Sequence, residues 1–187
     1  MADWNQIYED KSVAQTTPAR VLLDNQRLLP SSGKALDYAS GLSGNGVFLA
    51  QQGLDVKAWD LSDVAVSKVN AYAHKQHLSL HAEKMDLENN LQQLHGEFDV
   101  IVVSCFLHRV SLTVLYKLLK PQGVLFYQTF VGEQLNGVGP SQSKFRLHRG
   151  ELLNVFSNMR LLSYREDRCS SENNDVISDQ VFFVAQK

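Results

Sequence analysis

The 187-residue chain is poor in cysteine, with only two, and has only four prolines. Two cysteines cannot build the disulfide framework of a small secreted protein, and no C-x-x-C pair is present, so we expect no metal centre of that kind. No apolar run reaches the ~18 residues that a membrane-spanning helix needs. The first ten residues lack the basic-then-apolar order of a secretion signal. We therefore expect a protein of the reduced cytoplasmic compartment, with no membrane segment.

A strong excess of charge of one sign is also absent. The formal net charge is -2, which argues against an extended surface for nucleic acid. The hydrophobic content of 44% and the charged content of 20% are those of an ordinary globular protein. A chain of this length suits one domain over residues 1–187, with a helical extension over 1–33 and a core over 34–187.

Segments with the composition of strands alternate with helical segments. The expected strands are one that ends at Tyr38, followed by 56–60, 78–84, 98–103, 124–130, 159–166 and 180–186. The expected helices between them cover 45–52, 63–75, 88–94, 111–119 and 149–158. This alternation predicts βαβ units and an α/β fold with a mostly parallel seven-stranded sheet, in which the C-terminal strand is antiparallel.

The turn after the first strand carries the clearest signal. Strand residues 35–38 lead into Gly41-x-x-Gly44-x-Gly46, which opens a helix. A strand, a glycine-rich turn and a helix form the nucleotide-binding opening of an open α/β sheet, because glycine lets the backbone approach a ligand closely. The glycine spacing reverses that of the dinucleotide fingerprint G-x-G-x-x-G, and an acid, Asp37, precedes the turn.

Two further acids come directly after expected strands. Asp60 stands where a ribose-binding carboxylate follows a glycine-rich turn, although it could instead begin an exposed turn. Asp86 could accept a hydrogen bond from an adenine amino group, with Met85 and Leu87 as apolar walls, or cap the following helix. Since parallel strands end at one edge of the sheet, these acids and Gly41 are expected to meet there.

Together these features resemble the successive landmarks of class I S-adenosylmethionine-dependent methyltransferases. The resemblance rests on Asp37-x-Ala39-x-Gly41-x-Ser43, on Asp60 and Asp86, and on the segments 98–101 and 119–123. The residues around 106–109 and 139–141 are similar to small bacterial methyltransferases of the tellurite-resistance and thiopurine type. The resemblance implies a Rossmann-like three-layer sandwich that binds S-adenosylmethionine.

The resemblance also implies roles for individual residues. The backbone near Ala39 and Gly41 would face the methionine part of the cofactor, and Asp37 would lie near its positive charge. The implied cofactor-binding set is Asp37, Ala39, Gly41, Asp60, Leu61, Met85, Asp86, Leu87 and Ser104. The family usually has glycine at the positions of Ala39 and Ser43. Ala39 is a mild change, whereas Ser43 must adopt a backbone angle that serine can reach, or the shifted Gly44 and Gly46 must compensate.

Direct in-line methyl transfer requires mainly a positioned acceptor, because the sulfonium is already activated. His108 is the candidate general base, and the alternative is a structural histidine at a helix start. Cys105 is expected to be a small buried residue rather than a nucleophile.

The acceptor is expected to be a small molecule, because the N-terminal segment and the loop 131–147 that would surround it are both short. Aromatic side chains at Trp4, Tyr8, Tyr127 and Phe130 could form its walls or pack in the core. Basic residues at Lys144, Arg146, His148 and Arg149 could attract an anionic acceptor or form a solvated helix entry.

Two other functions stay open. A protein that binds the cofactor without catalysis would explain the absence of a firm catalytic residue. An NAD-dependent oxidoreductase would share the strand, turn and ribose acid, but the sequence lacks its glycine order. Methyl transfer to RNA, protein or DNA is disfavoured, because no appended basic domain and no Asn/Asp-Pro-Pro-aromatic run is present.

Overall fold

A computed structural model describes residues 3–135, 137–166 and 179–187. The strands are β1 Lys34–Tyr38, β2 Asp55–Asp60, β3 Leu80–Lys84, β4 Phe98–Ser104, β5 Leu119–Phe130, β6 Arg160–Glu166 and β7 Gln180–Gln186. The α-helices are α1 Trp4–Glu9, α2 Arg20–Asp24, α3 Gly44–Gln51, α4 Asp63–Gln76, α5 Arg109–Leu118 and α6 Glu151–Val155. Short 3-10 helices are η1 Val13–Gln15, η2 Gln26–Leu28, η3 Leu91–Gln93 and η4 Ser143–Phe145.

The strands form one seven-stranded sheet in the order β3-β2-β1-β4-β5-β7-β6. Strands β1 to β5 are mutually parallel, and β7 pairs antiparallel with both β5 and β6. This confirms the predicted fold class, including the antiparallel C-terminal strand.

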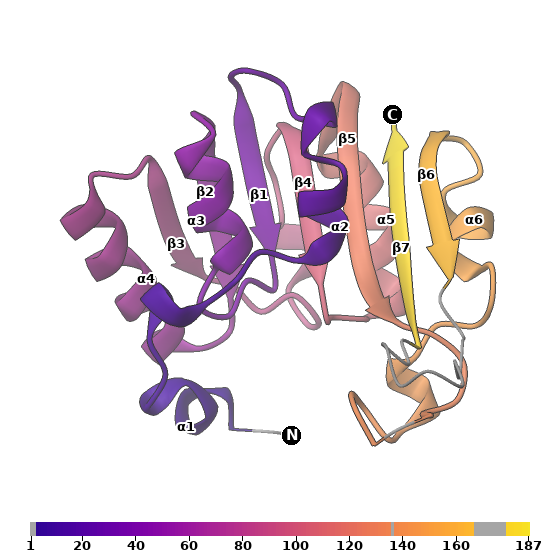
Figure 1. The fold of residues 1–187 in the computed structure, drawn as a ribbon, viewed down its shortest axis with the longest axis horizontal. Helices are drawn as coiled ribbons and strands as arrows, with labels where there is room; N and C mark the ends of the chain where they lie inside the picture. The colour runs from indigo at the N-terminus through magenta and orange to yellow at the C-terminus, as the bar shows by residue number, and fades with distance from the viewer. Residues whose placement is uncertain (1–2, 136, 167–178) are drawn as a thin grey trace.

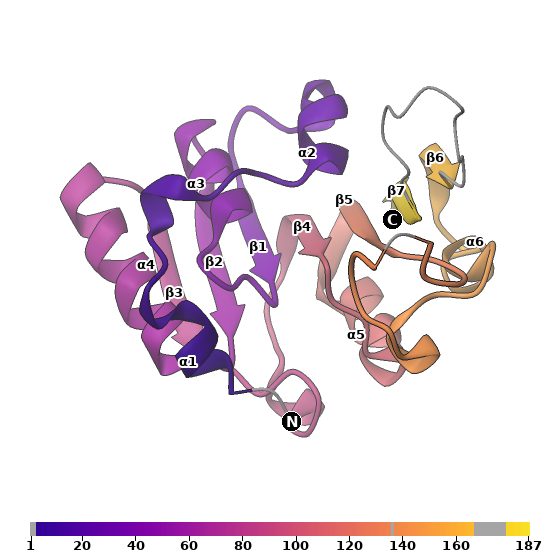
Figure 2. The ribbon, with the colours of Figure 1, turned by 60° about the horizontal axis from the view of Figure 1, so that its bottom comes forward.

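Helices cover both faces of the sheet and give three layers. Figures 1 and 2 show α2, α3 and α4 on one face and α5 and α6 on the other. The central strand β4 serves both layers: Val100 and Val102 pack with the first set of helices, and Ile101 and Val103 with the second. All four are fully buried, as expected for a parallel strand covered on both sides.

The strand order reverses between β1 and β4, which lie side by side although they are far apart in the chain. In open α/β sheets, ligands bind outside the carboxyl ends of the strands at this reversal. Two segments flank that edge in Figures 1 and 2: α1, below β2 and β3, and the loop that follows β5. None of the helices in the described ranges is long and apolar enough to span a bilayer.

One predicted helix is wrong. The segment 88–94 forms a turn followed by the 3-10 helix η3. The Asp86 carboxylate accepts hydrogen bonds from the backbone N–H groups of Glu88 and Asn89, at 3.1 Å and 2.9 Å. Asp and Asn side chains bond to nearby backbone in this way and so compete with helix formation. The predicted helix over 149–158 is also shorter than expected, at Glu151–Val155.

Candidate functional site

The turn between β1 and α3 is built from left-handed backbone. Ala39, Gly41 and Ser43 have φ values of 56°, 51° and 55°. For residues other than glycine this conformation costs about 1–2 kcal/mol each, and such strain gathers at functional sites. Ser43 therefore adopts the left-handed backbone angle itself, which is the first of its two expected alternatives, and Ala39 adopts the same conformation.

The Asp37 carboxylate, at the end of β1, binds this turn through hydrogen bonds. It accepts hydrogen bonds from Ser43 Oγ at 2.8 Å, from the backbone N–H of Gly46 at 3.0 Å and from Asn45 Nδ2 at 3.2 Å. Asp37 is fully buried, and this desolvation raises its pKa to about 7 although the hydrogen bonds act to lower it. The carboxyl is thus poised to ionise near neutral pH.

Asn45 is a site residue that the sequence analysis missed. Its Nδ2 also donates to Ser104 Oγ at 3.0 Å, and its Oδ1 accepts from the backbone N–H of Ala19 at 2.7 Å. It therefore joins β1, β4 and the N-terminal segment at the point where the strand order reverses. Its only sequence signal is an amide side chain between two glycines.

Asp60 lies where the ribose-binding acid was predicted. Its Oδ2 accepts from the backbone N–H of Gly41 at 2.7 Å and its Oδ1 from that of Ser62 at 2.9 Å. Burial raises the pKa of Asp60, with these backbone N–H groups opposing the rise. Each carboxylate oxygen keeps a lone pair for a further donor. The next strand is tied in by Met85, whose N–H donates to the Asp60 carbonyl at 2.8 Å.

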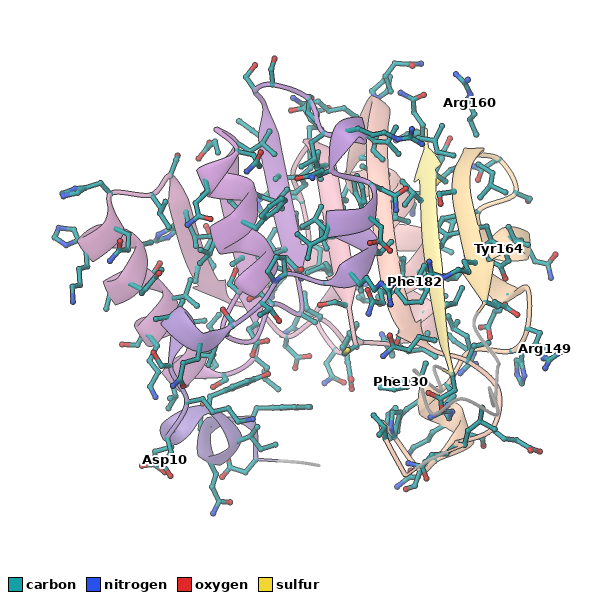
Figure 3. The ribbon with its side chains drawn as sticks, viewed as in Figure 1. Asp10, Phe130, Arg149, Arg160, Tyr164 and Phe182 are labelled. Carbon is teal, nitrogen blue, oxygen red and sulfur yellow. The ribbon has the colours of Figure 1, made fainter. Side chains whose placement is uncertain are left out.

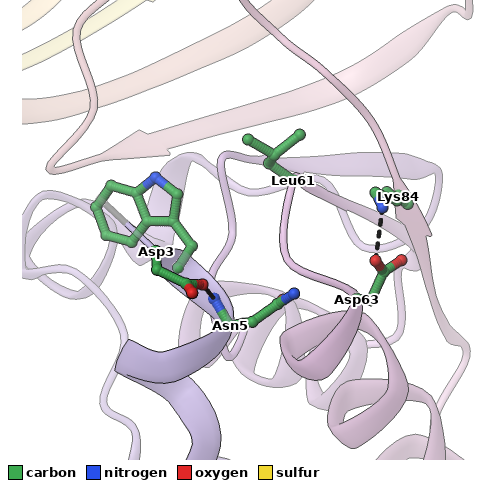
Figure 4. A pocket seen from close by; sticks show the side chains of 6 residues that line it. Asp3, Asn5, Leu61, Asp63 and Lys84 are labelled. Atoms are coloured by element: carbon green, nitrogen blue, oxygen red, sulfur yellow. Dashed lines mark hydrogen bonds and ion pairs between the residues drawn. The ribbon is translucent and has the colours of Figure 1, made fainter. Parts of the chain in front are cut away.

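A pocket opens between α1 and the ends of β2 and β3. Figure 4 shows its side chains, among them Leu61 and the ion pair that Lys84 makes with Asp63 at 2.5 Å. Its lining residues are Asp3, Trp4, Asn5, Leu61, Asp63 and Lys84. Leu61 is 38% exposed, so an apolar surface is available next to Asp60.

The other predicted adenine contacts are less open. The Asp86 carboxylate caps the turn that follows it, and the hydrogen bonds from Asn89 contribute most to lowering its pKa. Leu87 is buried in the core beside α5, and Met85 packs partly against the same cluster. The contact of these three residues with adenine stays a prediction.

Ser104 and Cys105 end β4 at the same edge. Cys105 is exposed and has a φ of 54°, so the expectation of a buried cysteine was wrong. The chain turns sharply there, with the Cys105 N–H donating to the Gln128 carbonyl at 2.8 Å. Its thiol is nonetheless partly desolvated, which raises the pKa of Cys105 and disfavours the thiolate.

His108 occupies the N-cap position of α5. Its Nδ1 is buried and has no hydrogen-bond partner among the described residues. The imidazole is close enough to Asp86 to help lower the pKa of that carboxyl. It therefore lies toward the predicted adenine end of the site, and a role as general base stays a prediction.

Of the four basic residues predicted after β5, Arg146 is buried, whereas Lys144, His148 and Arg149 are exposed. Arg146 is 2% exposed and forms an ion pair with Asp179. It also donates to the carbonyls of Val131, Gly132, Glu133 and Pro140. Arg146 thus fits neither expected alternative, an anion-attracting side chain or a solvated helix entry, because a buried guanidinium needs these acceptors to compensate its desolvation.

Arg109, at the start of α5, binds the same loop from outside. It pairs with both carboxylate oxygens of Glu151, at 2.7 Å and 2.9 Å, and donates to the carbonyls of Lys144 and Arg146, each at 2.8 Å. Arg149 is exposed, and Figure 3 shows it at the side of the molecule away from α1.

The predicted aromatic walls divide into two pairs. Tyr127 is buried and donates its hydroxyl to the Phe106 carbonyl at 2.8 Å. Phe130 is buried beneath the Arg146 guanidinium, 5.3 Å from its ring centre. Both belong to the core, whereas Trp4 and Tyr8 stack at the open edge with ring centres 6.2 Å apart. Across the part of the chain that the structure describes, no three His, Cys, Asp or Glu side chains gather as a metal site requires.

Comparisons with known proteins agree with this geometry. The family model described as "Tellurite resistance protein TehB" matches residues 3–181. The chain is 24% identical over 168 residues to YqeM of Bacillus subtilis, a suggested methyltransferase, and this match covers 83% of the chain and 62% of YqeM. The chain thus spans less than two thirds of that curated relative.

Solved structures share the fold. TehB of Haemophilus influenzae superimposes with a TM-score of 0.77 at 19% identity, over 98% of this chain and 67% of that one. An S-adenosylmethionine-dependent methyltransferase from Aquifex aeolicus has a TM-score of 0.71 at 16% identity, over 100% and 99%. A TehB-like methyltransferase from Corynebacterium glutamicum has a TM-score of 0.63 at 20% identity, over 99% and 96%. S-adenosylmethionine is therefore the expected cofactor.

Proposed function

The chain belongs to the TehB family, and from this premise we propose that it transfers the methyl group of S-adenosylmethionine to a small-molecule acceptor by direct in-line displacement. In this proposal residues 1–187 act as one methyltransferase domain. The observation that carries it is the hydrogen bond from the Gly41 N–H to the Asp60 carboxylate, which joins the strained turn to the ribose acid at the strand reversal.

The residues at this edge suit the cofactor. Asp60 would accept the ribose hydroxyls, because each of its oxygens has a lone pair beyond its backbone bond. Leu61 would pack against adenine, and the backbone at Ala39 and Gly41 would pass beside the methionine part. Once ionised, the Asp37 carboxylate would attract the positively charged sulfonium of the cofactor. The bound sulfonium supplies the activated methyl group, so the protein has to bind, orient and exclude water.

The acceptor in this proposal is small and does not depend on an arginine. Arg109 and Arg146 are held by Glu151, Asp179 and loop carbonyls. An oxyanion acceptor would have to be bound by backbone N–H groups or by exposed Lys144 instead. This favours an acceptor that is already nucleophilic, such as a small thiol, over one that needs a strong cationic site.

Cofactor binding without catalysis remains the second candidate. It is favoured by the burial of His108 Nδ1, which leaves the sequence-predicted base with one ring nitrogen at most for an acceptor. NAD binding is disfavoured by the glycine order of the turn.

Calorimetry with S-adenosylmethionine, S-adenosylhomocysteine and NAD tests the proposal. We expect micromolar binding of both sulfur compounds and none of NAD, and a loss of at least 100-fold in Asp60→Ala, which removes both ribose acceptors. Asp55→Ala, at the other end of β2, is the matched control and should bind normally. A folded wild-type protein that binds neither sulfur compound would end the methyltransferase proposal. Binding without methyl transfer across a panel of small thiols and oxyanions would favour the second candidate.

A further inference from the structure

The Tyr8 side chain covers the glycine-rich turn. A Cβ built on Gly41 would lie 2.6 Å from the Tyr8 hydroxyl oxygen and 3.0 Å from the ring carbon that bears it. The phenol therefore takes the space above Gly41 that any other side chain there would need. Tyr8 comes from α1, the N-terminal helix at the carboxyl edge of the sheet (Figure 2).

Helix α1 makes little apolar contact with the rest of the protein. None of its six residues is buried, and Tyr8 is the partly buried one that packs against the core. A helix of this length is marginal by itself in water. Its position on the protein must therefore come from contacts at its two ends.

Those contacts are polar, and both are made with α4. Near the start of α1, Asn5 Oδ1 accepts from Ser62 Oγ at 2.7 Å and so joins the N-cap of α4. At its end, Lys68 Nζ donates to the carbonyls of Tyr8 at 2.9 Å, Glu9 at 2.5 Å and Lys11 at 2.8 Å. Water can replace the partners of such exposed hydrogen bonds, so α1 can separate from α4 at a modest cost in free energy.

The hydroxyl of Tyr8 lies among acidic groups. Burial raises the pKa of Tyr8 to about 12, and Asp60, Asp37 and Cys105 add to the rise, in that order. Tyr8 is thus a neutral hydrogen-bond donor between the two carboxylates that bound the turn.

We propose that Tyr8 is a cofactor-positioning residue, whose hydroxyl donates a hydrogen bond to the amino-acid end of bound S-adenosylmethionine while α1 closes over it. The inference rests on the proposed function, because it needs the ribose at Asp60. With the ribose there, the group that lies over Gly41 is the one attached to the ribose C5′, namely the sulfonium and its amino acid. The carboxylate of that amino acid is an acceptor that a neutral phenol can bind beside Asp37 and Asp60.

The closure follows from the same geometry. With α1 in place, the phenol lies over Gly41 and Trp4 stacks on the phenol ring. The cofactor therefore enters when α1 lifts from α4, and the Lys68 bonds to three carbonyls then hold α1 closed. Lys68 acts through α1 and is not itself in contact with the cofactor.

Two ligands that differ in the amino-acid end test the hydroxyl contact. S-adenosylhomocysteine carries it and 5′-methylthioadenosine does not. We expect Tyr8→Phe to weaken S-adenosylhomocysteine about ten-fold and to leave 5′-methylthioadenosine unchanged. Tyr72→Phe, the same change on α4, is the control. Equal affinities in wild type and Tyr8→Phe, or an equal loss for both ligands, would overturn the inference. If the wild type did not bind S-adenosylhomocysteine, both the proposed function and the Tyr8 inference would be contradicted.

The closure has its own readout. We expect Lys68→Met to raise the dissociation rate of S-adenosylhomocysteine several-fold, measured by stopped-flow fluorescence. We also expect bound cofactor to slow amide hydrogen exchange over residues 4–11, and to do so more in wild type than in Lys68→Met. Lys75→Met, on the same helix, should behave as wild type. A cofactor-independent exchange rate over 4–11 would show that α1 does not close on the ligand.

Discussion

The turn over residues 37–46 and the loop over residues 131–149 flank the same edge of the sheet, yet they are held in opposite ways. The turn is fixed by backbone conformation and by short polar side chains around Asp37. The loop is fixed by two arginines, one buried with Asp179 and one paired with Glu151. The Asp37 carboxylate is therefore bound within a turn that Tyr8 covers, whereas the guanidinium groups of Arg146 and Arg109 are bound to carbonyls of the loop. Basic residues at a ligand edge thus need not bind ligand.

The two regions also differ in how strongly a substitution should lower the free energy of unfolding. In the loop, one guanidinium satisfies a buried carboxylate and several carbonyls, so its removal leaves many groups without partners. In the turn, each hydrogen bond contributes less to the free energy of unfolding, but several of them share the Asp37 carboxylate. Substitutions there should therefore change cofactor affinity more than stability.

The largest effect is expected for Arg146→Ala. It leaves the nearly buried Asp179 carboxylate without its partner, and we expect a loss of about 3–5 kcal/mol in the free energy of unfolding. Arg149→Ala, an exposed neighbour, should change it by less than about 0.5 kcal/mol. Urea unfolding measures both. A loss below about 1 kcal/mol in Arg146→Ala would mean that the loop is not held by this pair and that the contrast between the two regions is wrong.

A smaller, coupled effect is expected in the turn. A Cβ on Gly46 would lie 2.2 Å from Ser43 Oγ, which is bonded to Asp37. We expect Gly46→Ala to lower the free energy of unfolding by about 1–3 kcal/mol in wild type. In a Ser43→Gly background the loss should fall below about 1 kcal/mol, because only the 3.1 Å contact with Leu80 Cδ1 then remains tight. The four proteins form a double-mutant cycle read by thermal unfolding. Equal costs in both backgrounds would show that Ser43 does not set the requirement for glycine.

The smallest effect is a pH dependence that belongs to the turn alone. A pKa of Asp37 near 7 means that the folded protein binds a proton that the unfolded chain has already released, so this group's contribution to stability declines as pH rises from about 4 to about 7. A cationic ligand reverses the preference, since it favours the ionised carboxyl. We expect the affinity for S-adenosylmethionine to rise by up to about ten-fold from pH 6 to pH 8, or about 1.4 kcal/mol.

Calorimetry at pH 6, 7 and 8 checks this expectation. The uncharged ligand 5′-methylthioadenosine should show no such rise, and Asp37→Asn should show a flat profile for S-adenosylmethionine. A flat profile in wild type would place the cofactor's positive charge away from Asp37.

The structure brings predicted site residues together where turn and strand-end patterns of the backbone carried the signal. Gly41 and Asp60 were predicted from turn and strand-end patterns, and the structure joins them by a hydrogen bond at 2.7 Å. Asn45 was missed because its partners, Ser104 and Ala19, come from distant parts of the chain. Arg146 was misjudged for the same reason, since its partner Asp179 is 33 residues away in sequence.

The sequence by itself therefore determined the local order: the alternation of strands and helices, the parallel sheet with its antiparallel C-terminal strand, and the glycine-rich turn after β1. These depend on periodicity and on backbone freedom, which neighbouring residues set. The tertiary structure alone decided which charged and polar side chains remain available to a ligand. Availability depends on burial and on partners from distant segments, such as Asp179 for Arg146 and Gly41 for Tyr8, and no local pattern of residues encodes it.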